Sequence, residues 1–331
     1  MKAIIPVAGI GSNLRPHTHT QPKPLIPVAG KPILGHIIDN LLHAGVSKQV
    51  FVVGYLKEKI QEYVSRHYAG QVEMEFVIQE PRRGLAHAIW TAREHLRNSK
   101  DLLIVLGDTI FGEDTHLVVE MPGSVLAVHQ VDDPRAFGIA MLDEQMFVKK
   151  VTEKPHIPTS NLALVGLYKI REVDVLLDVL DEMVENEPGD NHEFLLTDAL
   201  MQMIRRGVRF RTHTVENWFD CGRKQTLLQT NRILLSQQAV EVGDRFPGSV
   251  IIPPVHIPDT CEIESSIVGP YVAVGEHARI NNSIVRNSIL GAYSELDFII
   301  LNNSVVGNDT LLRGKSNSIN VGDNAEIDFD L

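Results

Sequence analysis

The N-terminal stretch Met1–Pro32, MKAIIPVAGIGSNLRPHTHTQPKPLIPVAGKP, decides the fold class of this chain. It begins with a short apolar run, Met1–Val7, which is typical of a buried strand, and the run leads directly into a glycine-rich loop. The backbone N–H groups of such a loop can surround phosphate oxygens. Two cations, Arg15 and Lys23, follow the loop at once. Together these features indicate a nucleoside triphosphate site at the edge of a parallel sheet.

The glycines alone are a weak signal, because Gly9 and Gly11 lack the third glycine of a dinucleotide fingerprint and no P-loop Lys-Ser/Thr pair follows them. The segment Pro22-Lys-Pro-Leu25, followed by Pro27-Val-Ala-Gly-Lys-Pro32, is more specific. It resembles the signature of the sugar nucleotidyltransferase family, in particular glucose-1-phosphate thymidylyltransferases and uridylyltransferases. The resemblance implies a reaction in which a sugar 1-phosphate attacks the α-phosphorus of a nucleoside triphosphate and pyrophosphate leaves.

Size and composition exclude several other classes of protein. The chain has 331 residues, of which 44% are hydrophobic, and can hold one large domain and a smaller one. Its net charge of −11 argues against a nucleic-acid binder, which needs a basic face. The apolar N-terminus is too short for a signal peptide, and no run is long enough to span a membrane. With Cys221 and Cys261 as the only cysteines, we expect no disulfide and a cytoplasmic location.

Residues 1–230 alternate predicted strands and helices. The predicted strands are Ala3–Val7, Gln49–Val53, Glu73–Ile78, Leu102–Leu106, Ser124–Val128, Leu162–Ile170 and Arg209–Thr214. The predicted helices are Ile33–Ala44, Leu56–Ala69, Gly84–Leu96, Val173–Leu180 and Leu195–Gly207. Several strands are continuous aliphatic runs, as expected of strands covered on both faces. The pattern predicts an α/β, Rossmann-like domain with a mixed, mostly parallel sheet and its ligand at the carboxyl ends of the strands.

The composition changes after a connecting helix predicted at Leu227–Val242. From about Ile251 an aliphatic residue recurs roughly every six positions, with breaks in the rhythm, which is the hexapeptide pattern of a parallel β-helix. The recurring residues, which we expect to point inward, are Ile257, Ile263, Val268, Val274, Ile280, Leu290, Leu296, Val306, Leu312, Val321 and Ile327. A small sandwich of short strands is the alternative. We place the catalytic domain at 1–232, a linker helix at 233–248 and the β-helix at 249–331.

The predicted β-helix also resembles the left-handed β-helix of some sugar nucleotidyltransferases. Because its end coils can pair with other subunits, we expect it to serve assembly, into a homo-oligomer from dimer to tetramer. In some relatives such a β-helix is an acyltransferase. His256 and His277 are isolated within the repeat, and we interpret both as solvent-facing residues and not as an acyltransferase site.

Nucleotidyl transfer joins two anions, so the site must neutralise charge and align the reacting groups. Asp108 follows the apolar strand Leu102–Leu106, at the end of a strand where ligands bind. Asp220 lies in Trp218-Phe-Asp-Cys-Gly222, which matches a family Trp-x-Asp motif. Carboxylates together with phosphate and water are the ligands that Mg²⁺ prefers. We therefore predict Mg²⁺ as cofactor, held by Asp108 and Asp220.

The residues predicted to bind the nucleotide fall in two segments. In the N-terminal loop they are Ala8, Gly9, Gly11, Ser12 and Asn13, and the cations that act on the phosphates are Lys23 and Arg15. The resemblance places base recognition at Gln79 and Gly84. A glutamine amide suits the O4/N3–H edge of uracil or thymine better than that of cytosine. One methyl group separates the two favoured bases, so we expect dTTP or UTP.

The resemblance also implies the sugar-phosphate site. Glu153-Lys154-Pro155 matches a family motif in which the glutamate binds sugar hydroxyls and the lysine binds the sugar phosphate. Gly138 and Val165 match positions whose backbone contacts the sugar. We interpret Glu193–Asp198 mainly as a structural helix start, with Glu193 reaching the site as the alternative.

One position departs from the family pattern. Asn13 stands where the family carries an arginine that grips the triphosphate, and an amide cannot replace a guanidinium fork. Three readings follow: a slow enzyme in which Arg15 or Arg82–Arg83 compensates, an engineered variant, or a non-catalytic relative that binds nucleotide or sugar nucleotide. Because the other charged residues of the motifs are present, we expect an enzyme that joins dTTP or UTP to a hexose 1-phosphate, and glucose 1-phosphate is favoured.

Overall fold

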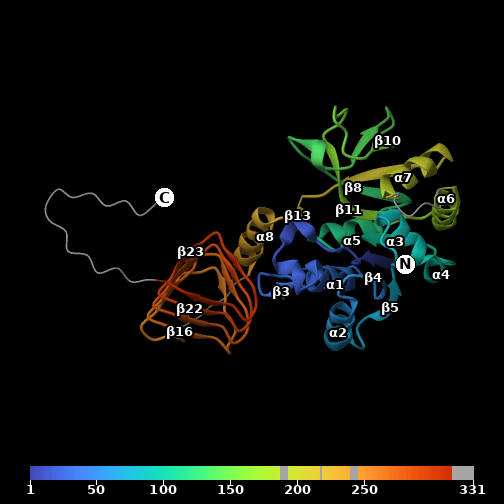
Figure 1. Cartoon of the computed structure of the whole chain (residues 1–331). Helices are drawn as coiled ribbons and strands as arrows, with labels where there is room; N and C mark the ends of the chain where they lie inside the picture. Colours follow the sequence, from blue (N-terminus) through green and yellow to red (C-terminus); the bar gives the residue numbers. More distant parts are fainter. Residues whose placement is uncertain (187–192, 217, 239–244, 315–331) are drawn as a thin grey trace. The chain divides into compact units, whose positions relative to one another are not determined.

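The structure is a computed structural model that describes residues 1–186, 193–216, 218–238 and 245–314 (Figure 1). The chain divides into two compact units, Met1–Thr230 and Asn231–Leu331. Within the described residues, no helix is both long and apolar enough to cross a bilayer.

A mixed nine-stranded sheet organises the first unit, and its parallel part carries the N-terminal motif. The parallel strands run in the order β6-β1-β4-β5. Their bounds are β1 (Lys2–Pro6), β4 (Lys48–Val53), β5 (Glu73–Ile78) and β6 (Leu102–Val105). The middle residues of β1 and all of β6 are buried, since helices cover both faces of this part of the sheet. The predicted central strands are therefore confirmed.

Five further strands extend the sheet beyond β6, and all but one of their pairings are antiparallel. The long strand β11 (Leu162–Ile170) runs antiparallel to β6, β8 and β9. The remaining strands of this sheet are β8 (Ser124–Gln130), β9 (Ile139–Leu142), β10 (Val148–Thr152) and β12 (Phe210–Thr214). The register of β11 against β8 shifts between Leu164 and Tyr168. Two short antiparallel pairs complete the unit, β2 (Pro27–Val28) with β3 (Lys31–Pro32) and β7 (Thr109–Phe111) with β13 (Trp218–Asp220).

Eight α-helices are described in the chain. They are α1 (Ile33–His43), α2 (Lys57–Tyr68), α3 (Leu85–Thr91), α4 (Arg93–Leu96), α5 (Asp114–Glu120), α6 (Val173–Asn186), α7 (Leu196–Arg205) and α8 (Lys224–Gln237). The single helix predicted at Gly84–Leu96 is wrong in one respect, because it is interrupted at Ala92 and forms α3 and α4. The helix predicted at Val173–Leu180 continues to Asn186, since Met183 and Val184 also pack on the core. Helix α8 begins three residues before the prediction, and part of the predicted helix lies outside the described residues.

The second unit is a left-handed β-helix built from three parallel sheets (Figure 1). The first sheet holds β14 (Val250–Ile251), β17 (Ile267–Val268), β20 (Ile284–Arg286) and β23 (Ile300–Asn302). The second holds β15 (Val255–His256), β18 (Val272–Val274), β21 (Ile289–Leu290) and β24 (Val305–Val306). The third holds β16 (Glu262–Glu264), β19 (Arg279–Asn281), β22 (Glu295–Asp297) and β25 (Leu311–Arg313). All strand pairs are parallel, which excludes the sandwich alternative.

The predicted inward residues from Ile257 to Leu312 all lie in or against the core of this β-helix. Val321 and Ile327 lie outside the described residues. The breaks in the rhythm have a structural cause. In the first sheet, paired residues are 17, 17 and 16 positions apart along the chain, at Val250, Ile267, Ile284 and Ile300. A coil of three full hexapeptides would need 18, so some corners are shorter by a residue, and the core is kept by Val285 and Leu301, which the sequence pattern missed.

Buried serines hold neighbouring coils together. The Oγ of Ser266 accepts a hydrogen bond from the backbone N–H of Ser283 at 3.1 Å and donates to the Glu264 carbonyl at 2.7 Å. Ser283 Oγ repeats the arrangement one coil later, where it accepts from the Ile299 N–H at 3.1 Å. Each hydroxyl is thus used entirely by backbone groups of the β-helix.

Candidate active site

The closest ion pair among the predicted residues joins Lys23 to Asp108. Lys23 lies in the short helical turn Lys23–Leu25, whose two flanking prolines restrict the backbone, and its Nζ lies 2.5 Å from Asp108 Oδ2. Asp108 follows β6, as predicted, and its other oxygen accepts from the Thr109 hydroxyl at 3.3 Å. The lysine side chain is only 14% exposed, whereas the carboxylate is 40% exposed. The pair is therefore open to a ligand from the carboxylate side.

Asp220 lies close to this pair because β13 is paired with β7, which places Asp220 opposite Thr109. The backbone N–H of Gly222 donates to Asp220 Oδ1 at 2.8 Å. Burial raises the pKa of the Asp220 carboxyl, and the neighbouring Asp108 carboxylate raises it further. Two carboxylates and one compensating lysine meet here, and a cation bound between the carboxylates would relieve their repulsion. This donor set fits Mg²⁺, which takes few protein ligands and keeps oxygens from water and phosphate.

Asp108 and Asp220 line a pocket of about 550 Å³ within the first unit. The other predicted residues that line it are Gly138, Glu153, Lys154 and Val165. Lining residues that the prediction did not name include Phe137, Tyr168, Thr197 and Trp218. Glu193 also lines the pocket, so the reading of Glu193–Asp198 as mainly structural is incomplete. The pocket places the candidate metal ligands and the candidate sugar ligands in one cavity.

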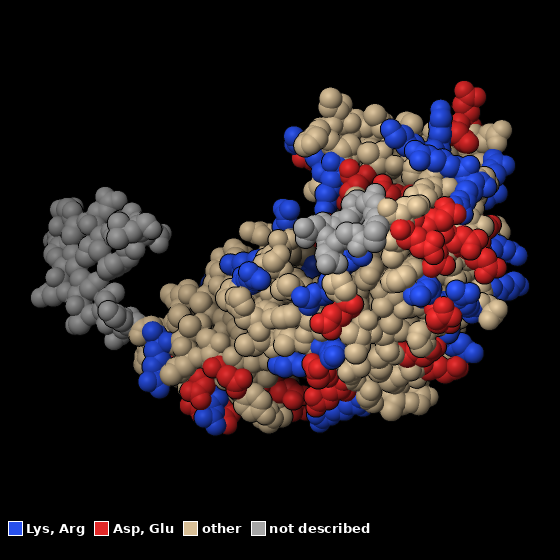
Figure 2. Space-filling model, turned by 45° about the vertical axis from the view of Figure 1, so that its right-hand side comes forward, with Lys and Arg blue, Asp and Glu red and all other residues tan. Residues whose placement is uncertain are grey.

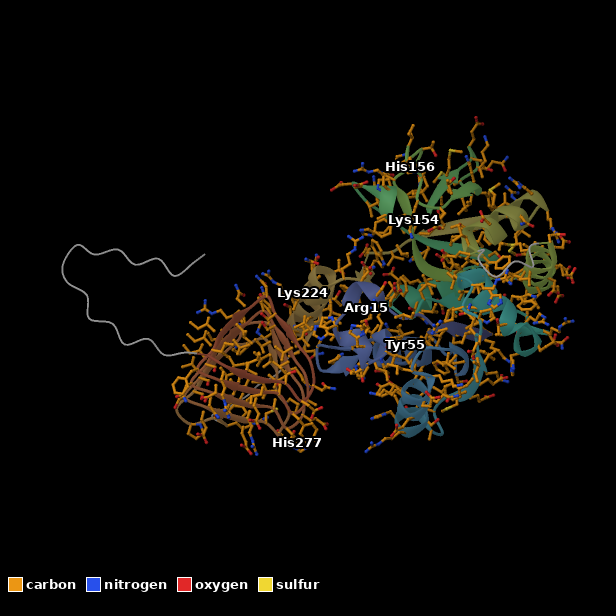
Figure 3. The ribbon with its side chains drawn as sticks, in the orientation of Figure 1. Arg15, Tyr55, Lys154, His156, Lys224 and His277 are labelled. Carbon is orange, nitrogen blue, oxygen red and sulfur yellow. The ribbon has the colours of Figure 1, made fainter. Side chains whose placement is uncertain are left out.

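Glu153 is held from the side by Thr197. The Thr197 hydroxyl donates to Glu153 Oε2 at 3.1 Å, and Lys154 Nζ lies 3.7 Å from Glu153 Oε1. Gly138 lies so near that a Cβ on it would be 3.2 Å from Glu153 Oε2. The Lys154 side chain is 65% exposed, and Figure 3 shows it on the part of the unit drawn in green. The arrangement leaves Glu153 Oε1 and Lys154 available to a ligand.

Val165 lies in β11 within the register shift, next to Gly166, which has a φ of 92°. A side chain at Gly166 would collide with Leu106, so only glycine allows this close approach of β11 to the strand that leads to Asp108. Tyr168 follows on the same strand and is buried, which raises the pKa of its hydroxyl above the usual range. The irregular segment thus contains Val165, which lines the pocket.

The predicted phosphate loop is brought to Lys23 by Gly11. This glycine has a φ of 70°, and a Cβ there would lie 2.7 Å from Lys23 Cβ. Ala8 is buried and its carbonyl accepts from the Tyr55 N–H at 3.1 Å, which anchors the start of the loop. Gly9 is exposed and has open space around it.

Ser12, Asn13 and Arg15 lie outside the described pocket. Ser12 and Asn13 begin the short turn Ser12–Leu14, and Asn13 is exposed. Arg15 is exposed as well, and Figure 3 shows it among the N-terminal segments, away from Lys154. The structure does not bring these three side chains against the carboxylates, and their roles at the phosphates remain predictions.

Gln79 and Gly84 are connected directly. Gln79 Nε2 donates to the Gly84 carbonyl at 2.9 Å and lies 3.1 Å from His87 Nδ1. Gly84 has a φ of 95°, and a Cβ there would lie 2.5 Å from the Phe194 carbonyl, so the position requires glycine. Two backbone hydrogen bonds, Ala86 N–H to Phe194 O and Phe194 N–H to Arg83 O, tie this loop to the segment around Phe194, which leads to the pocket lined by Asp108 and Asp220.

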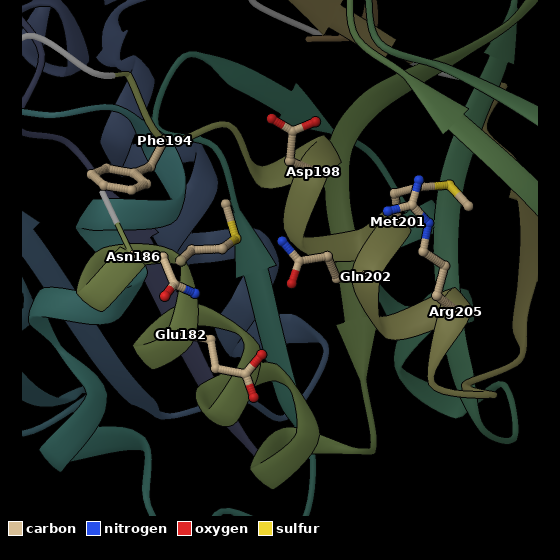
Figure 4. A pocket seen from close by; sticks show the side chains of 8 residues that line it. Glu182, Asn186, Phe194, Asp198, Met201, Gln202 and Arg205 are labelled. Atoms are coloured by element: carbon tan, nitrogen blue, oxygen red, sulfur yellow. The ribbon is translucent and has the colours of Figure 1, made fainter. Parts of the chain in front are cut away.

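A second cleft, of about 420 Å³, lies between α6 and α7 (Figure 4). Its lining includes Glu182, Asn186, Gln202 and Arg205. Asp198, from the Glu193–Asp198 motif, lines this cleft and not the pocket lined by Asp108 and Asp220. Thr197 and Asp198, which are adjacent in the motif, therefore line two different cavities. Over the face in Figure 2, acidic and basic side chains are interspersed.

Comparison with known proteins agrees with this geometry. The nucleotidyl transferase family model matches residues 2–237, which is most of the chain. This chain belongs to that family. The family model for the GlmU-like C-terminal hexapeptide region matches residues 219–290 and thus includes the first coils of the β-helix. The nucleotidyl transferase match covers both the Lys23–Asp108 pair and Asp220.

The relatives of this nucleotidyl transferase include a nucleotidyltransferase of glycan biosynthesis and a glucose-1-phosphate thymidylyltransferase. The low-salt glycan biosynthesis nucleotidyltransferase Agl11 of Haloferax volcanii is 30% identical over 324 residues, 90% of this chain and 89% of that protein. The glucose-1-phosphate thymidylyltransferase of Streptomyces antibioticus is 30% identical and covers 89% of this chain and 88% of its own length. The bifunctional protein GlmU of Methanococcus maripaludis is 35% identical over 76% of this chain, but the match spans 59% of that protein.

A crystal structure from Bacillus anthracis, provisionally assigned as a glucose-1-phosphate thymidylyltransferase, superposes with a TM-score of 0.61 at 27% identity. It covers 73% of this chain and 97% of its own length. The nucleotidyl transferase is therefore a sugar-phosphate nucleotidyltransferase, as the resemblance implied. The comparisons give no support to the non-catalytic alternative.

Sequence reasoning missed Thr197, Tyr168, His87 and Trp218. A signal existed for Thr197, because it lies inside the Glu193–Asp198 motif that resembled the family. His87 follows Gly84 by three positions, and its contact with Gln79 depends on the turn between β5 and α3. Trp218 was quoted only as part of the motif around Asp220, although it lines the pocket and packs against Phe137 with ring centroids 5.2 Å apart.

Proposed function

We propose that this nucleotidyl transferase joins a pyrimidine nucleotide from dTTP or UTP to a hexose 1-phosphate, with glucose 1-phosphate favoured and Mg²⁺ required. The observation that carries the proposal is the single pocket lined by the Asp108 and Asp220 carboxylates, Glu153 and Lys154. Metal-binding carboxylates and a polar ligand for sugar hydroxyls are the two groups of residues that this reaction must bring together. The thymidylyltransferase among the relatives supports the choice of substrates.

In this reaction an oxygen of the sugar phosphate forms a bond to the α-phosphorus, and the bond from that phosphorus to pyrophosphate breaks. The sugar phosphate is itself the nucleophile, so the chain supplies none. Because both reacting groups are anions, the chain acts by placing positive charge beside them. Asp108 and Asp220 would hold a Mg²⁺ ion, which when bound would neutralise phosphate charge at this end of the pocket. Lys23 would exchange its contact with Asp108 for one with the triphosphate, because a cation released by the metal ligand is free to bind phosphate.

The sugar phosphate would be held by the opposite wall of the pocket. Glu153 accepts from Thr197 through Oε2 and offers Oε1 to the sugar hydroxyls. The exposed Lys154 ammonium, next to Glu153 in the chain, would bind the sugar phosphate. Backbone groups at Gly138 and Val165 would complete the contacts to the sugar. Gln79 and Gly84 would bind the base, and the loop from Ala8 through Asn13 with Arg15 would bind the triphosphate.

A pyrophosphate-release assay tests this proposal. Glucose 1-phosphate and Mg²⁺ are combined with dTTP, UTP, CTP, GTP or ATP, and the native chain is compared with Asn13→Arg. We expect turnover with dTTP, UTP or both, and a faster rate in Asn13→Arg because a guanidinium adds a charged donor at the phosphates. Turnover with purine nucleotides alone would contradict the base assignment. If neither protein releases pyrophosphate with any nucleotide, the proposal is contradicted, and a subunit that binds nucleotide or sugar nucleotide without turnover is favoured.

A further inference from the structure

The Gln79 amide is held by two acceptors at once. Its Nε2 lies 2.9 Å from the Gly84 carbonyl and 3.1 Å from His87 Nδ1. A carbonyl oxygen can only accept, so the NH₂ group of the amide must face Gly84. Both N–H bonds of the amide are then used inside the protein. For Gln79 Oε1, no protein partner is found among the residues that the structure describes, so this oxygen is the group left for a ligand.

His87 is built to accept and not to donate at Nδ1. Its ring is buried between Trp90, at 5.4 Å between centroids, and Phe194, which it stacks against at 6.2 Å. The ring nitrogen that faces an amide N–H must carry a lone pair, which requires a neutral imidazole with its proton on Nε2. The aromatic contacts restrict rotation of the ring and keep Nδ1 on the side of Gln79.

Burial and the nearby Arg83 guanidinium favour the neutral form of His87. Arg83 comes from the loop before α3, and Glu193 lies in the segment beside the start of that helix. On α6, Asp181 accepts a hydrogen bond from Trp90 Nε1 at 2.8 Å and is thereby engaged. Burial lowers the pKa of His87, and the Arg83 guanidinium lowers it further. The imidazole is thus an acceptor at neutral pH.

We propose that His87 is a positioning residue for base selection, because its neutral Nδ1 and the Gly84 carbonyl together fix the Gln79 amide so that only Oε1 is offered to the base. The inference rests on the proposed function, in which Gln79 meets the pyrimidine. Uracil and thymine carry a hydrogen on N3 and donate it to this oxygen. Cytosine has a lone pair at N3, which would meet a second acceptor. Selection against cytosine then depends on an amide that cannot rotate to exchange the positions of its oxygen and its nitrogen.

Protonation of His87 would reverse the arrangement. A proton on Nδ1 faces the amide N–H and repels it. Rotation of the amide then lets Oε1 accept from the imidazolium, and this charge-assisted hydrogen bond replaces the neutral one to the Gly84 carbonyl. The NH₂ group is then offered to the base and suits the N3 of cytosine. Selection for uracil and thymine is therefore present above the pKa of His87 and is lost as the pH falls through it.

The test compares kcat/KM for UTP and CTP from about pH 5.5 to about pH 8.5 in the native chain, His87→Asn and His87→Phe. The ratio of the two nucleotides cancels pH effects on the triphosphate that they share. We expect the native ratio to fall about 10-fold toward acid, as expected for loss of one oriented hydrogen bond in a polar site. His87→Asn keeps an acceptor near Nδ1 that does not titrate, so its ratio stays high and flat. His87→Phe has no acceptor, so its ratio stays low at every pH, while the KM for sugar phosphate is unchanged.

Gln79→Leu separates failure of this inference from failure of the proposed function. If Gln79→Leu loses the preference for UTP but His87→Phe keeps it, the role of His87 is overturned and the base site stands. If Gln79→Leu also keeps the preference, the base site lies elsewhere and both fail. If His87→Phe does not fold, as judged by thermal melting, the pH profiles of the native chain and His87→Asn decide, and identical profiles overturn the inference. If the chain has no catalytic activity, the affinities for UTP and CTP measured by calorimetry give the same comparison. If neither nucleotide binds, the inference about His87 is overturned.

Discussion

Both units of the chain bury polar side chains, but they use them differently. In the first unit, the Asp108 and Asp220 carboxylates line one pocket from separate segments, and Lys23 is paired with Asp108. In the β-helix, the hydroxyls of Ser266 and Ser283 are neutral and are bonded to the backbone of neighbouring coils. The first arrangement leaves charged groups facing a pocket, whereas in the second the hydroxyls have no hydrogen bonds left to offer a ligand. The difference identifies which buried polar residues are candidates for chemistry.

The largest effect on activity is expected from Asp108→Asn, which changes one of the charged groups at the pocket. We expect kcat/KM to fall about 10³-fold, or about 4 kcal/mol, because an amide binds Mg²⁺ poorly and leaves Lys23 unpaired. Pyrophosphate release at a fixed Mg²⁺ concentration measures the effect. Asp297→Asn on β22 is the matched control, since it makes the same change on the β-helix, and it should leave turnover within about 2-fold. A rate in Asp108→Asn within tenfold of native would remove Asp108 from the site.

The complementary change is Ser283→Ala in the β-helix. It leaves the Ile299 N–H without its acceptor, and we expect the free energy of unfolding to drop by about 1–3 kcal/mol. Turnover per folded molecule should not change. Calorimetry measures stability, and tryptophan fluorescence reports the first unit alone, because Trp90 and Trp218 both lie there. A loss of activity without a loss of stability would show that the serine does more than join coils.

A smaller effect is expected from Thr197→Val, which keeps the shape of the side chain and removes its hydroxyl. Glu153 would lose the donor that holds Oε2, and we expect the KM for sugar phosphate to rise about 10-fold, or about 1.4 kcal/mol. The KM for nucleotide should stay constant. Steady-state kinetics with each substrate varied in turn measure both values. Thr214→Val, at an exposed position of β12 in the same unit, is the control. An unchanged sugar KM would mean that Thr197 serves only packing.

Acid should affect the two units unequally. Burial lowers the pKa of His17, His36 and His87 in the first unit, and of His256 in the β-helix. When the folded pKa is below the ordinary value of 6.5, the unfolded chain binds protons first as the pH falls. The stability is therefore complete above that value and decreases as the pH drops through the folded pKa values. Calorimetry from about pH 7.5 to about pH 5 should show the larger decrease for the first unit, and equal decreases would contradict this.

The β-helix was predictable in detail because its signal is local. Each inward residue, such as Ile263 or Leu296, is marked by its spacing from the next, and the spacing survives shortened corners. The central strands were predictable for the same reason, since a continuous aliphatic run such as Leu102–Val105 is complete within itself. Wrong or incomplete boundaries occurred where packing overrides the local pattern, as at the break between α3 and α4.

The candidate site was predictable only in part. Residues inside motifs of the family, such as Lys23 and Asp220, could be named because the resemblance carried them. Thr197 contacts Glu153 across 44 positions of the chain, and no spacing rule connects such residues. His87 could not be assigned either, because its contact with Gln79 depends on how the loop at Gly84 turns. Assignments of this kind need the fold, since they depend on which segments the sheet brings together.

The uneven coils of the β-helix have a consequence for how such a chain can vary over generations. A coil here can be 17 or 16 residues long and still present its aliphatic residue inward, because the missing residue is removed at a corner. Single-residue deletions and insertions at corners are then neutral to the core, whereas the same changes within a strand would reverse every side chain that follows. The number of residues can therefore vary at the corners of each coil, whereas it must stay constant within the strands.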